Sequence, residues 1–345
     1  MPDAHPLPTG DATGRPLLTD SFGRQMTYLR LSVTDRCDLR CVYCMAEHMR
    51  FVSHRDLLTL EELYRLSAVF MRHGVRKIRI TGGEPLVRKN IMCLFEMLSR
   101  HIGNGDLDEL VLTTNGTQLP RFAQQLYDYG LRRINVSLDS LDPDRYRTLT
   151  RGGDVRKVLA GIEAAQAAGL KVKINSVAMR GAFEEELDDL IRFTHERGID
   201  LTLIEEMPLG DVHHDRASSF LPLDRVRKDL ERRWTLTPLK ANTGGPAHYV
   251  QVEETGGRLG FITPLSCDFC ASCNRVRVSC TGDLYTCMGK DTSVPLREAL
   301  RTSCGDEKVE GVIYDAITHK PERHSLSVAG DAVSGIGRHM SVLGG

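Results

Sequence analysis

Eight of the ten cysteines in this 345-residue chain fall into two groups. The groups comprise Cys37, Cys41 and Cys44 near the N-terminus, and Cys267, Cys270, Cys273, Cys280 and Cys287 near the C-terminus. The first has C-x₃-C-x₂-C spacing, and three residues of the second form C-x₂-C-x₁₃-C. Clustered cysteines in a reducing compartment indicate metal binding rather than disulfides. Three thiolates can hold one face of an iron–sulfur cluster and leave one iron open to a small molecule.

The cysteine spacing alone leaves other interpretations open. The first group could form a structural zinc site with a distant fourth ligand, or bind no metal. The C-x₂-C pair of the second group favours zinc when taken by itself. Cys267 or Cys280 could add a fourth ligand there and close the site. Cys93 and Cys304 stand outside both groups, and we expect them to be small buried hydrophobic residues.

Strand and helix patterns alternate along the first two thirds of the chain. Strands are expected at 28–33, 77–81, 109–114, 132–138, 171–178 and 200–206, and helices at 59–73, 90–101, 119–129, 155–168 and 184–197. Six such units predict a parallel sheet with crossover helices. They fall short of a closed eight-fold barrel, so we expect an open, partial βα barrel, with a doubly wound sheet as the alternative.

Both architectures bind ligands at the carboxyl ends of the strands. Polar or glycine-rich segments end or follow these strands at the first cysteine loop, 82–85, 113–116, 137–140 and Met207. Their agreement predicts one shared site. We divide the chain into a flexible arm at 1–20, the partial barrel at 21–210, and a smaller α+β extension at 211–345 that carries the second cysteine group. A polar linker with His213 and His214 opens the extension.

Bulk composition limits the classes of function. Lys+Arg number 45 and Asp+Glu 46, which gives no support for nucleic-acid or membrane binding. No run of 18 apolar residues occurs. The first 20 residues have neither the apolar core of a secretory signal nor the character of a transit peptide. We therefore expect a cytoplasmic protein without a membrane span.

The residues around the first cysteines carry a family resemblance. Thr34-Asp35-Arg36-Cys37 and Val42-Tyr43-Cys44-Met45 resemble the cluster loop of the radical S-adenosylmethionine superfamily, and Gly82-Gly83-Glu84-Pro85 resembles its second motif. The resemblance implies a [4Fe-4S] cluster on Cys37, Cys41 and Cys44. Glycines in the second motif would allow backbone groups to approach the methionine end of the cofactor.

The second cysteine region narrows the resemblance. Pro264, the run 269–277 (FCASCNRVR), Gly282 and Cys287 look like the C-terminal cluster loop of the GTP 3′,8-cyclase (MoaA) family of molybdenum cofactor biosynthesis. The resemblance extends from Arg30 to the closing Gly-Gly. It implies a second [4Fe-4S] cluster and radical cyclisation of GTP to (8S)-3′,8-cyclo-7,8-dihydroguanosine 5′-triphosphate.

The resemblance also assigns residues, position by position. Cys270, Cys273 and Cys287 would hold the second cluster. The residues that match S-adenosylmethionine contacts are Tyr43, Gly83, Ser137 and Met207. The residues that match GTP contacts are Arg30, Arg79, Thr113, Lys173, Arg275 and Arg277. The residues implied to act in catalysis are Arg275, Arg277, Gly344 and Gly345.

Physical chemistry supports the arginine assignments independently. Arg275 and Arg277 alternate with two valines, so both should project from one face of a strand. Arginine forks suit the oxygens of a triphosphate. Asn274 is expected to fix the loop rather than bind metal. A slender Gly344-Gly345 end could thread into a crowded cavity, although a frayed terminus is the ordinary expectation for such a tail.

Three positions depart from the family pattern. Asp38 stands where Asn is usual, and Thr202 and Glu206 stand where we expect Arg and an aromatic or apolar residue. Competing functions are a peptide-modifying radical maturase and a zinc or redox-sensing module. The implied partners are GTP, a flavodoxin- or ferredoxin-like one-electron reductant and the downstream cyclic pyranopterin monophosphate synthase. A homodimer is left as an option.

Overall fold

The computed structural model describes residues 17–210, 212, 216–240, 244–266, 269–329, 332–334 and 336–344. His213, His214, Cys267 and Gly345, which were singled out in the sequence, lie outside the described residues. So does most of the expected N-terminal arm. The last four residues of that arm are packed, because Leu18 is fully buried and Asp20 forms a 2.6 Å ion pair with Arg24.

The six expected strands form one parallel array. They are β1 (Tyr28–Ser32), β2 (Lys77–Thr81), β3 (Glu109–Thr114), β4 (Arg133–Ser137), β5 (Lys171–Ala178) and β6 (Asp200–Glu205). Each strand pairs with the next in sequence order, without reversal. A doubly wound sheet would reverse direction at its switch point. The order therefore favours the partial barrel over the doubly wound alternative.

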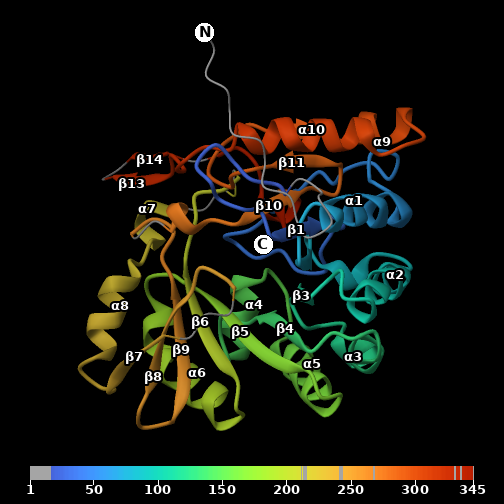
Figure 1. Ribbon diagram of the computed structural model, residues 1–345. Coiled ribbons are helices and arrows are strands. Elements are labelled where there is room, and N and C mark those ends of the chain that lie inside the picture. Colours follow the sequence, from blue (N-terminus) through green and yellow to red (C-terminus); the bar gives the residue numbers. More distant parts are fainter. Residues whose placement is uncertain are drawn as a thin grey trace.

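Helices connect these strands. They are α1 (Leu60–Arg72), α2 (Ile91–Gly103), α3 (Leu119–Asp128), α4 (Pro143–Leu149), α5 (Val155–Ala167) and α6 (Ala182–Glu196). Thr59 and Glu62 form a capping box that begins α1. Figure 1 shows α1, α2, α3 and α5 along one side of the sheet. The sequence patterns missed α4, although Asp142 caps it and Pro143 stands at its first position.

The C-terminal part extends the same sheet at both edges. Its elements are α7 (Arg216–Ser219), α8 (Leu223–Leu230), β7 (Leu236–Leu239), β8 (His248–Val252), β9 (Gly257–Ile262), β10 (Arg275–Val278), β11 (Asp283–Tyr285), β12 (Val294–Pro295), α9 (Arg297–Thr302), α10 (Glu307–Thr318), β13 (Ser327–Ala329), β14 (Ala332–Ser334) and α11 (Met340–Leu343). β9 joins β6 and β10 joins β1, both in parallel. The two outermost strands, β12 and β7, leave the 12-stranded sheet open.

The main core lies between the sheet and its helices. Apolar residues of α2 repeat at Ile91, Leu94, Phe95 and Leu98, which is the stripe of an amphipathic helix. Cys93 lies off that stripe and is exposed, so the expectation of a buried thiol was wrong.

Cys304 is exposed as well, because it lies in the connection between α9 and α10. The expectation of a buried thiol was therefore wrong there too. Among the described residues, no helix is both long and apolar enough to span a bilayer.

Candidate active site

Strand register brings cationic side chains together on the inner face of the sheet. Arg30 of β1 pairs with Arg277 on one side and with Arg79 of β2 on the other. Because alternate residues of a strand share a face, the residues two positions earlier, Tyr28, Lys77 and Arg275, line the same surface. The six GTP-contact candidates all border one cavity: Arg30, Arg79, Thr113, Lys173, Arg275 and Arg277.

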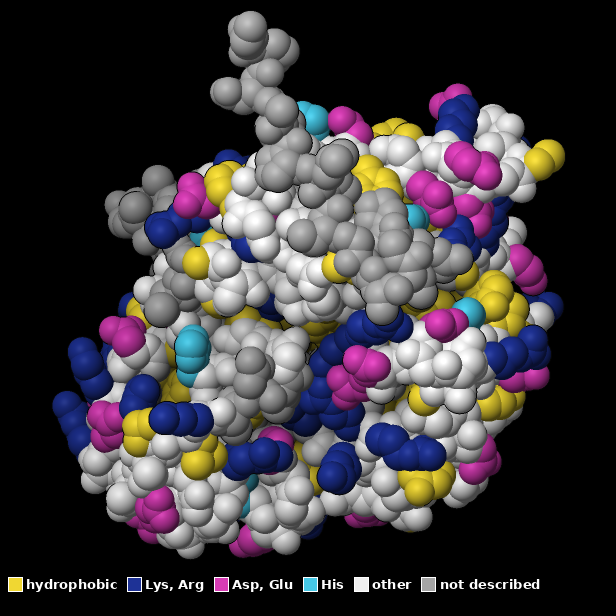
Figure 2. Space-filling model, viewed as in Figure 1, with side chains coloured by type: hydrophobic (Ala, Val, Ile, Leu, Met, Phe, Trp, Pro, Cys, Tyr) yellow, Lys and Arg dark blue, Asp and Glu magenta, His cyan; other side chains and the backbone are white. Residues whose placement is uncertain are grey.

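The cavity is strongly positive. It encloses about 1330 Å³ of empty space, part of which is open solvent at its mouth. Seven basic residues border it, namely Arg30, Lys77, Arg79, Arg133, Lys173, Arg275 and Arg277. Among the described residues no Asp or Glu lines it. Figure 2 shows Lys and Arg side chains gathered around a hollow on this face.

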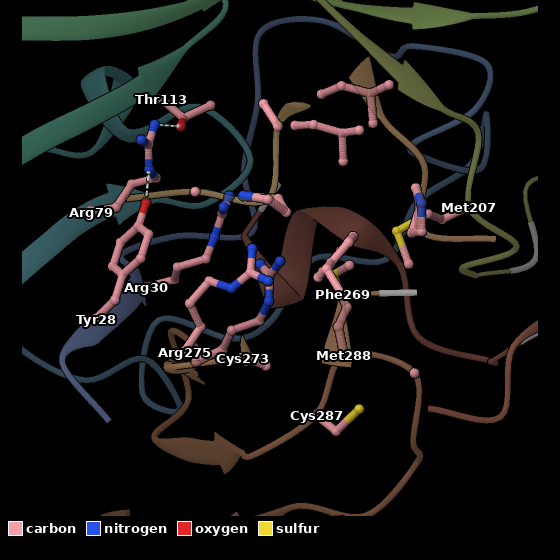
Figure 3. A pocket seen from close by; sticks show the side chains of 18 of the residues that line it. Tyr28, Arg30, Arg79, Thr113, Met207, Phe269, Cys273, Arg275, Cys287 and Met288 are labelled. Carbon is pink, nitrogen blue, oxygen red and sulfur yellow. Dashed lines mark hydrogen bonds between the residues drawn. The ribbon is translucent and has the colours of Figure 1, made fainter. Parts of the chain in front are cut away.

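Arg79 is held in place by two neighbours. Its Nε donates to the Tyr28 hydroxyl, and its Nη1 donates to the Thr113 hydroxyl at 2.9 Å. Figure 3 shows Arg79 between these two residues, with Arg30 and Arg275 pointing into the same space. Burial opposes ionisation of Tyr28, but Arg79, Arg30 and Lys77 together lower its pKa to about 7. When ionised, the Tyr28 phenolate therefore offsets part of the surplus positive charge.

The buried guanidinium groups repel one another. Burial and the neighbouring Arg277 hold the pKa of Arg30 well below its usual value. Burial and Arg275 lower the pKa of Arg277 to about 10. Such crowding is costly unless an anion enters. The geometry therefore suits a ligand with several negative charges.

Tyr28, Lys77 and Arg133 also line the cavity, and the sequence did not predict them. Lys77 pairs with Glu109 at 2.8 Å, and Arg133 pairs with the same carboxylate. Lys173, which the sequence did predict, donates to the Tyr249 hydroxyl at 2.7 Å. The alternation of polar and apolar residues in β2 and β4 could have indicated Lys77 and Arg133. Tyr28 gave no signal, because a tyrosine in a strand is ordinary.

The second cysteine triad borders the same cavity. Cys270, Cys273 and Cys287 line its wall, and Figure 3 shows Cys273 and Cys287 near Arg275 and Met288. Cys280 does not line the cavity. It is buried on the other face of β10, where Asp35 is among the charged groups that act on it.

The loop around this triad is tied to neighbouring strands. Asn274 donates to the Thr27 hydroxyl at 2.7 Å, and its carbonyl accepts from the backbone of Thr27 and Tyr28. This confirms a loop-fixing role for Asn274. His324 also borders the cavity, and both of its ring nitrogens are buried without a hydrogen-bond partner among the described residues.

The first triad lies in the long loop between β1 and α1. Burial raises the pKa of Cys37, Cys41 and Cys44, with Cys44 reaching about 12. The charged groups Glu84 and Asp139 add to this effect. Thiols bind metal as thiolates. Bound iron would supply the positive charge that these surroundings lack, so the donor set fits an iron–sulfur cluster.

The Gly-Gly-Glu-Pro segment braces this loop. A Cβ on Gly83 would lie 2.4 Å from the Arg36 carbonyl oxygen, and one on Gly82 would lie 2.5 Å from that of Thr34. The Glu84 carboxylate accepts from the backbone N–H groups of Leu86 and Asn115. Both glycines are therefore needed for packing of the two loops, whatever cofactor contact Gly83 makes.

Three of the four cofactor-contact candidates, Gly83, Ser137 and Met207, end or follow strands, and Tyr43 lies in the loop of the first triad. The Tyr43 hydroxyl donates to buried Asp139 at 2.7 Å. Ser137 ends β4 and pairs with Asn175 of β5. Met207 follows β6 and lines the cavity, across from Arg79 in Figure 3.

The C-terminal tail runs from the cavity to the first triad. Met340 of α11 lines the cavity, and the backbone N–H of Ser341 donates to the Cys44 sulfur. The Gly344 carbonyl accepts from Arg277. The tail thus lies inside the site rather than as a frayed end, up to the last residue described.

Of the three residues that depart from the family pattern, Asp38 and Glu206 form hydrogen bonds with neighbours, and Thr202 has a glycine beside it. Asp38 accepts from Asn115 and Thr117, at 2.6 Å in both cases. Glu206 is buried and accepts from the Ser219 hydroxyl at 2.7 Å, with Arg216 at 3.5 Å. Thr202 of β6 pairs with Gly260 of β9, and its buried hydroxyl has no hydrogen-bond partner among the described residues.

Comparison with known proteins identifies the family. The model of the Radical SAM superfamily matches residues 31–194, and that of Molybdenum Cofactor Synthesis C matches residues 199–326. A GTP 3′,8-cyclase of Rhizobium etli (strain CIAT 652) is 57% identical over 95% of this chain and 94% of its own. One of Brucella melitensis biotype 2 (strain ATCC 23457) is 57% identical over 95% and 96%. The chain belongs to the GTP 3′,8-cyclase family.

A solved structure supports the fold. SuiB of Streptococcus suis, bound to the precursor peptide SuiA, aligns with a TM-score of 0.61 at 16% identity, over 86% of this chain and 68% of its own. At that identity the likeness shows the fold alone. The expected radical S-adenosylmethionine architecture with an open sheet is confirmed. Family membership favours the cyclase over the peptide-modifying and zinc-binding alternatives.

Proposed function

We propose that this protein is the radical lyase that cyclises GTP to (8S)-3′,8-cyclo-7,8-dihydroguanosine 5′-triphosphate, the first step of molybdenum cofactor biosynthesis. The single observation that carries the proposal is the cavity that joins seven cationic side chains to a cysteine triad. Cyclase relatives at 57% identity support it.

The first triad is proposed to hold the [4Fe-4S] cluster that acts with S-adenosylmethionine. When bound, this cluster supplies the electron that cleaves the cofactor to a 5′-deoxyadenosyl radical. The residues of this chain orient the reactants and exclude water. Tyr43, Gly83, Ser137 and Met207 are proposed to contact the cofactor.

GTP is proposed to bind between the cationic strands and the second triad. Arg30, Arg79, Lys173 and Thr113 would hold the triphosphate by charge-assisted hydrogen bonds. Arg275 and Arg277 would hold the nucleotide next to Cys270, Cys273 and Cys287. A second [4Fe-4S] cluster on this triad would leave one iron open towards the guanine.

Tyr28 should make GTP binding depend on pH. With a pKa near 7, Tyr28 becomes an anion above neutrality and repels the triphosphate. The charged groups around it are Arg30, Lys77, Arg79, Arg133 and Arg277. We expect GTP to bind roughly tenfold more weakly at pH 8.5 than at pH 6.5, a difference of about 1.4 kcal/mol.

The Tyr28→Phe variant separates this effect from titration of GTP itself. It should lose most of the pH dependence and bind GTP more tightly than the wild type at pH 8.5. Equilibrium binding measured under argon at both pH values tests this. Parallel pH profiles in both proteins would show that Tyr28 does not ionise in this range.

The proposed reaction is tested with anaerobically reconstituted protein, S-adenosylmethionine and dithionite. With GTP present, mass spectrometry should detect the cyclised nucleotide together with 5′-deoxyadenosine. Iron and sulfide should approach two clusters per chain. Formation of 5′-deoxyadenosine that does not depend on GTP would favour a maturase, and zinc without sulfide would favour a non-enzymatic module.

The remaining assignments are part of the same proposal. Residues 21–210 form the radical domain, and 211–345 form the extension that carries the second cluster and the Gly-Gly tail. A flavodoxin- or ferredoxin-like protein would supply the electron. The product would pass to the cyclic pyranopterin monophosphate synthase, in the cytoplasm.

A further inference from the structure

Lys320 is a buried lysine beside the second cysteine triad. It follows α10, and only 3% of the residue is exposed. Its ammonium donates to the backbone carbonyl of Arg275 at 3.1 Å and to that of Thr286. Arg275 is two residues from Cys273, and Thr286 directly precedes Cys287. One ammonium group therefore joins the two strand ends that carry these cysteines.

Among the described residues, no carboxylate balances the charge of Lys320. Across the part of the chain that the structure describes, no Asp or Glu forms an ion pair with this side chain, and both hydrogen-bond acceptors are neutral carbonyls. Burying an ammonium group without an anion is costly. Lys320 acts electrostatically on two groups that can become negative, the thiols of Cys273 and Cys287.

The local electrostatics agree with this pairing. Arg275 adds a second positive charge beside Cys273. The charged side chains that act most on the first triad are instead acidic: Glu84, Asp38 and Asp139. The two triads therefore have opposite electrostatic surroundings.

A second cation nearby has a different role. Arg24 donates to the Cys270 carbonyl and to the Pro321 carbonyl, each at 2.7 Å. Its charge is already balanced by Asp20, at 2.6 Å. Arg24 thus holds the backbone of Cys270, the remaining cysteine of the triad, and the segment after Lys320 without adding net charge. Lys320 is the cation that acts on both Cys273 and Cys287, while Arg275 adds positive charge at Cys273.

We propose that Lys320 is a positioning residue for the second triad, whose buried ammonium fixes Cys273 and Cys287 and makes the cluster there easier to reduce than the first. The inference rests on the proposed second cluster. A nearby positive charge stabilises the state with one more electron, so the charge raises the reduction potential.

The test is a redox titration of anaerobically reconstituted full-length protein, followed by electron paramagnetic resonance. A Cys41→Ala background, which lacks one ligand of the first cluster, resolves the signal of the second. Lys320→Met removes the charge, Lys320→Arg keeps it, and Lys308→Met changes an exposed lysine of α10 as a control. We expect Lys320→Met to shift the reduction equilibrium of the second cluster about tenfold towards the oxidised state, or about 59 mV. Lys320→Arg should keep the potential close to the wild-type value, and Lys308→Met should leave it unchanged.

Each alternative result has a defined meaning. An unchanged potential in Lys320→Met with the second cluster present would overturn the role of Lys320. If that variant failed to fold, Lys320→Gln, which keeps a hydrogen-bond donor without the charge, would replace it. Loss of folding in both variants before iron is added would also overturn the inference, because Lys320 would then serve the polypeptide rather than the cluster. A wild-type protein with one cluster would instead contradict the proposed function.

Discussion

Alanine at Cys44 is expected to abolish both 5′-deoxyadenosine formation and GTP cyclisation, whereas alanine at Cys287 should abolish cyclisation alone. Cys44 lies in the triad proposed to act with S-adenosylmethionine, and Cys287 borders the nucleotide cavity. We expect the cyclised product to fall below about a thousandth of the wild-type rate in both variants, a barrier increase of about 4 kcal/mol. Cleavage of S-adenosylmethionine should persist in Cys287→Ala within about tenfold of the wild-type rate.

The asymmetry follows from the placement of the two triads. The radical source requires the first triad and the cofactor, and neither depends on a ligand from the second. Cys287→Ala removes one of the three thiolates that position the proposed second cluster near GTP. GTP would still bind through the cationic side chains and permit cofactor cleavage, but the radical would meet a misplaced nucleotide and be quenched.

Cys93→Ala is the matched control, because Cys93 is exposed on α2 and belongs to neither group. It should match the wild type in iron content, cofactor cleavage and product. Iron and sulfide analysis with chromatography of both products makes the comparison. Equal loss of cofactor cleavage in Cys44→Ala and Cys287→Ala would contradict a division of labour between the triads.

Much of the fold could be predicted from local patterns. The β1–β6 strands agree with the expected ranges within one or two residues, because buried parallel strands give short apolar runs bounded by turn signals. The pairing of β10 with β1 could not be predicted. Paired residues of these strands, such as Tyr28 and Arg275, are 247 positions apart, and nothing local to Arg275–Val278 indicates its partner.

The same limit separates the site residues that were found from those that were missed. Cysteine triads and glycine loops carry their chemistry in their spacing, so they could be identified without the fold. Tyr28 and Lys77 gain a role only because register sets them beside Arg30, Arg79 and Arg275. Lys320 gains a role only because the segment after α10 reaches the backbone of Arg275 and Thr286.

Valine at Gly344 is expected to disable cyclisation while leaving both clusters in place. Gly344 has a φ of +77°, and a Cβ there would lie 1.9 Å from the Thr81 hydroxyl oxygen and 2.8 Å from the Thr81 Cβ. A left-handed backbone costs a non-glycine residue about 1–2 kcal/mol. Overpacking adds about 1–3 kcal/mol. The docked tail should therefore be depleted by about 30-fold or more.

Loss of the docked tail removes two contacts at once. The Gly344 carbonyl no longer accepts from Arg277, and the Ser341 N–H no longer donates to Cys44. Gly337→Val is the control, since a Cβ at Gly337 meets open space. Product formation, iron content and circular dichroism are compared with a chain that ends at Leu343. If both Gly344→Val and the truncated chain cyclise GTP at the wild-type rate, the tail occupies the cavity without contributing to the reaction.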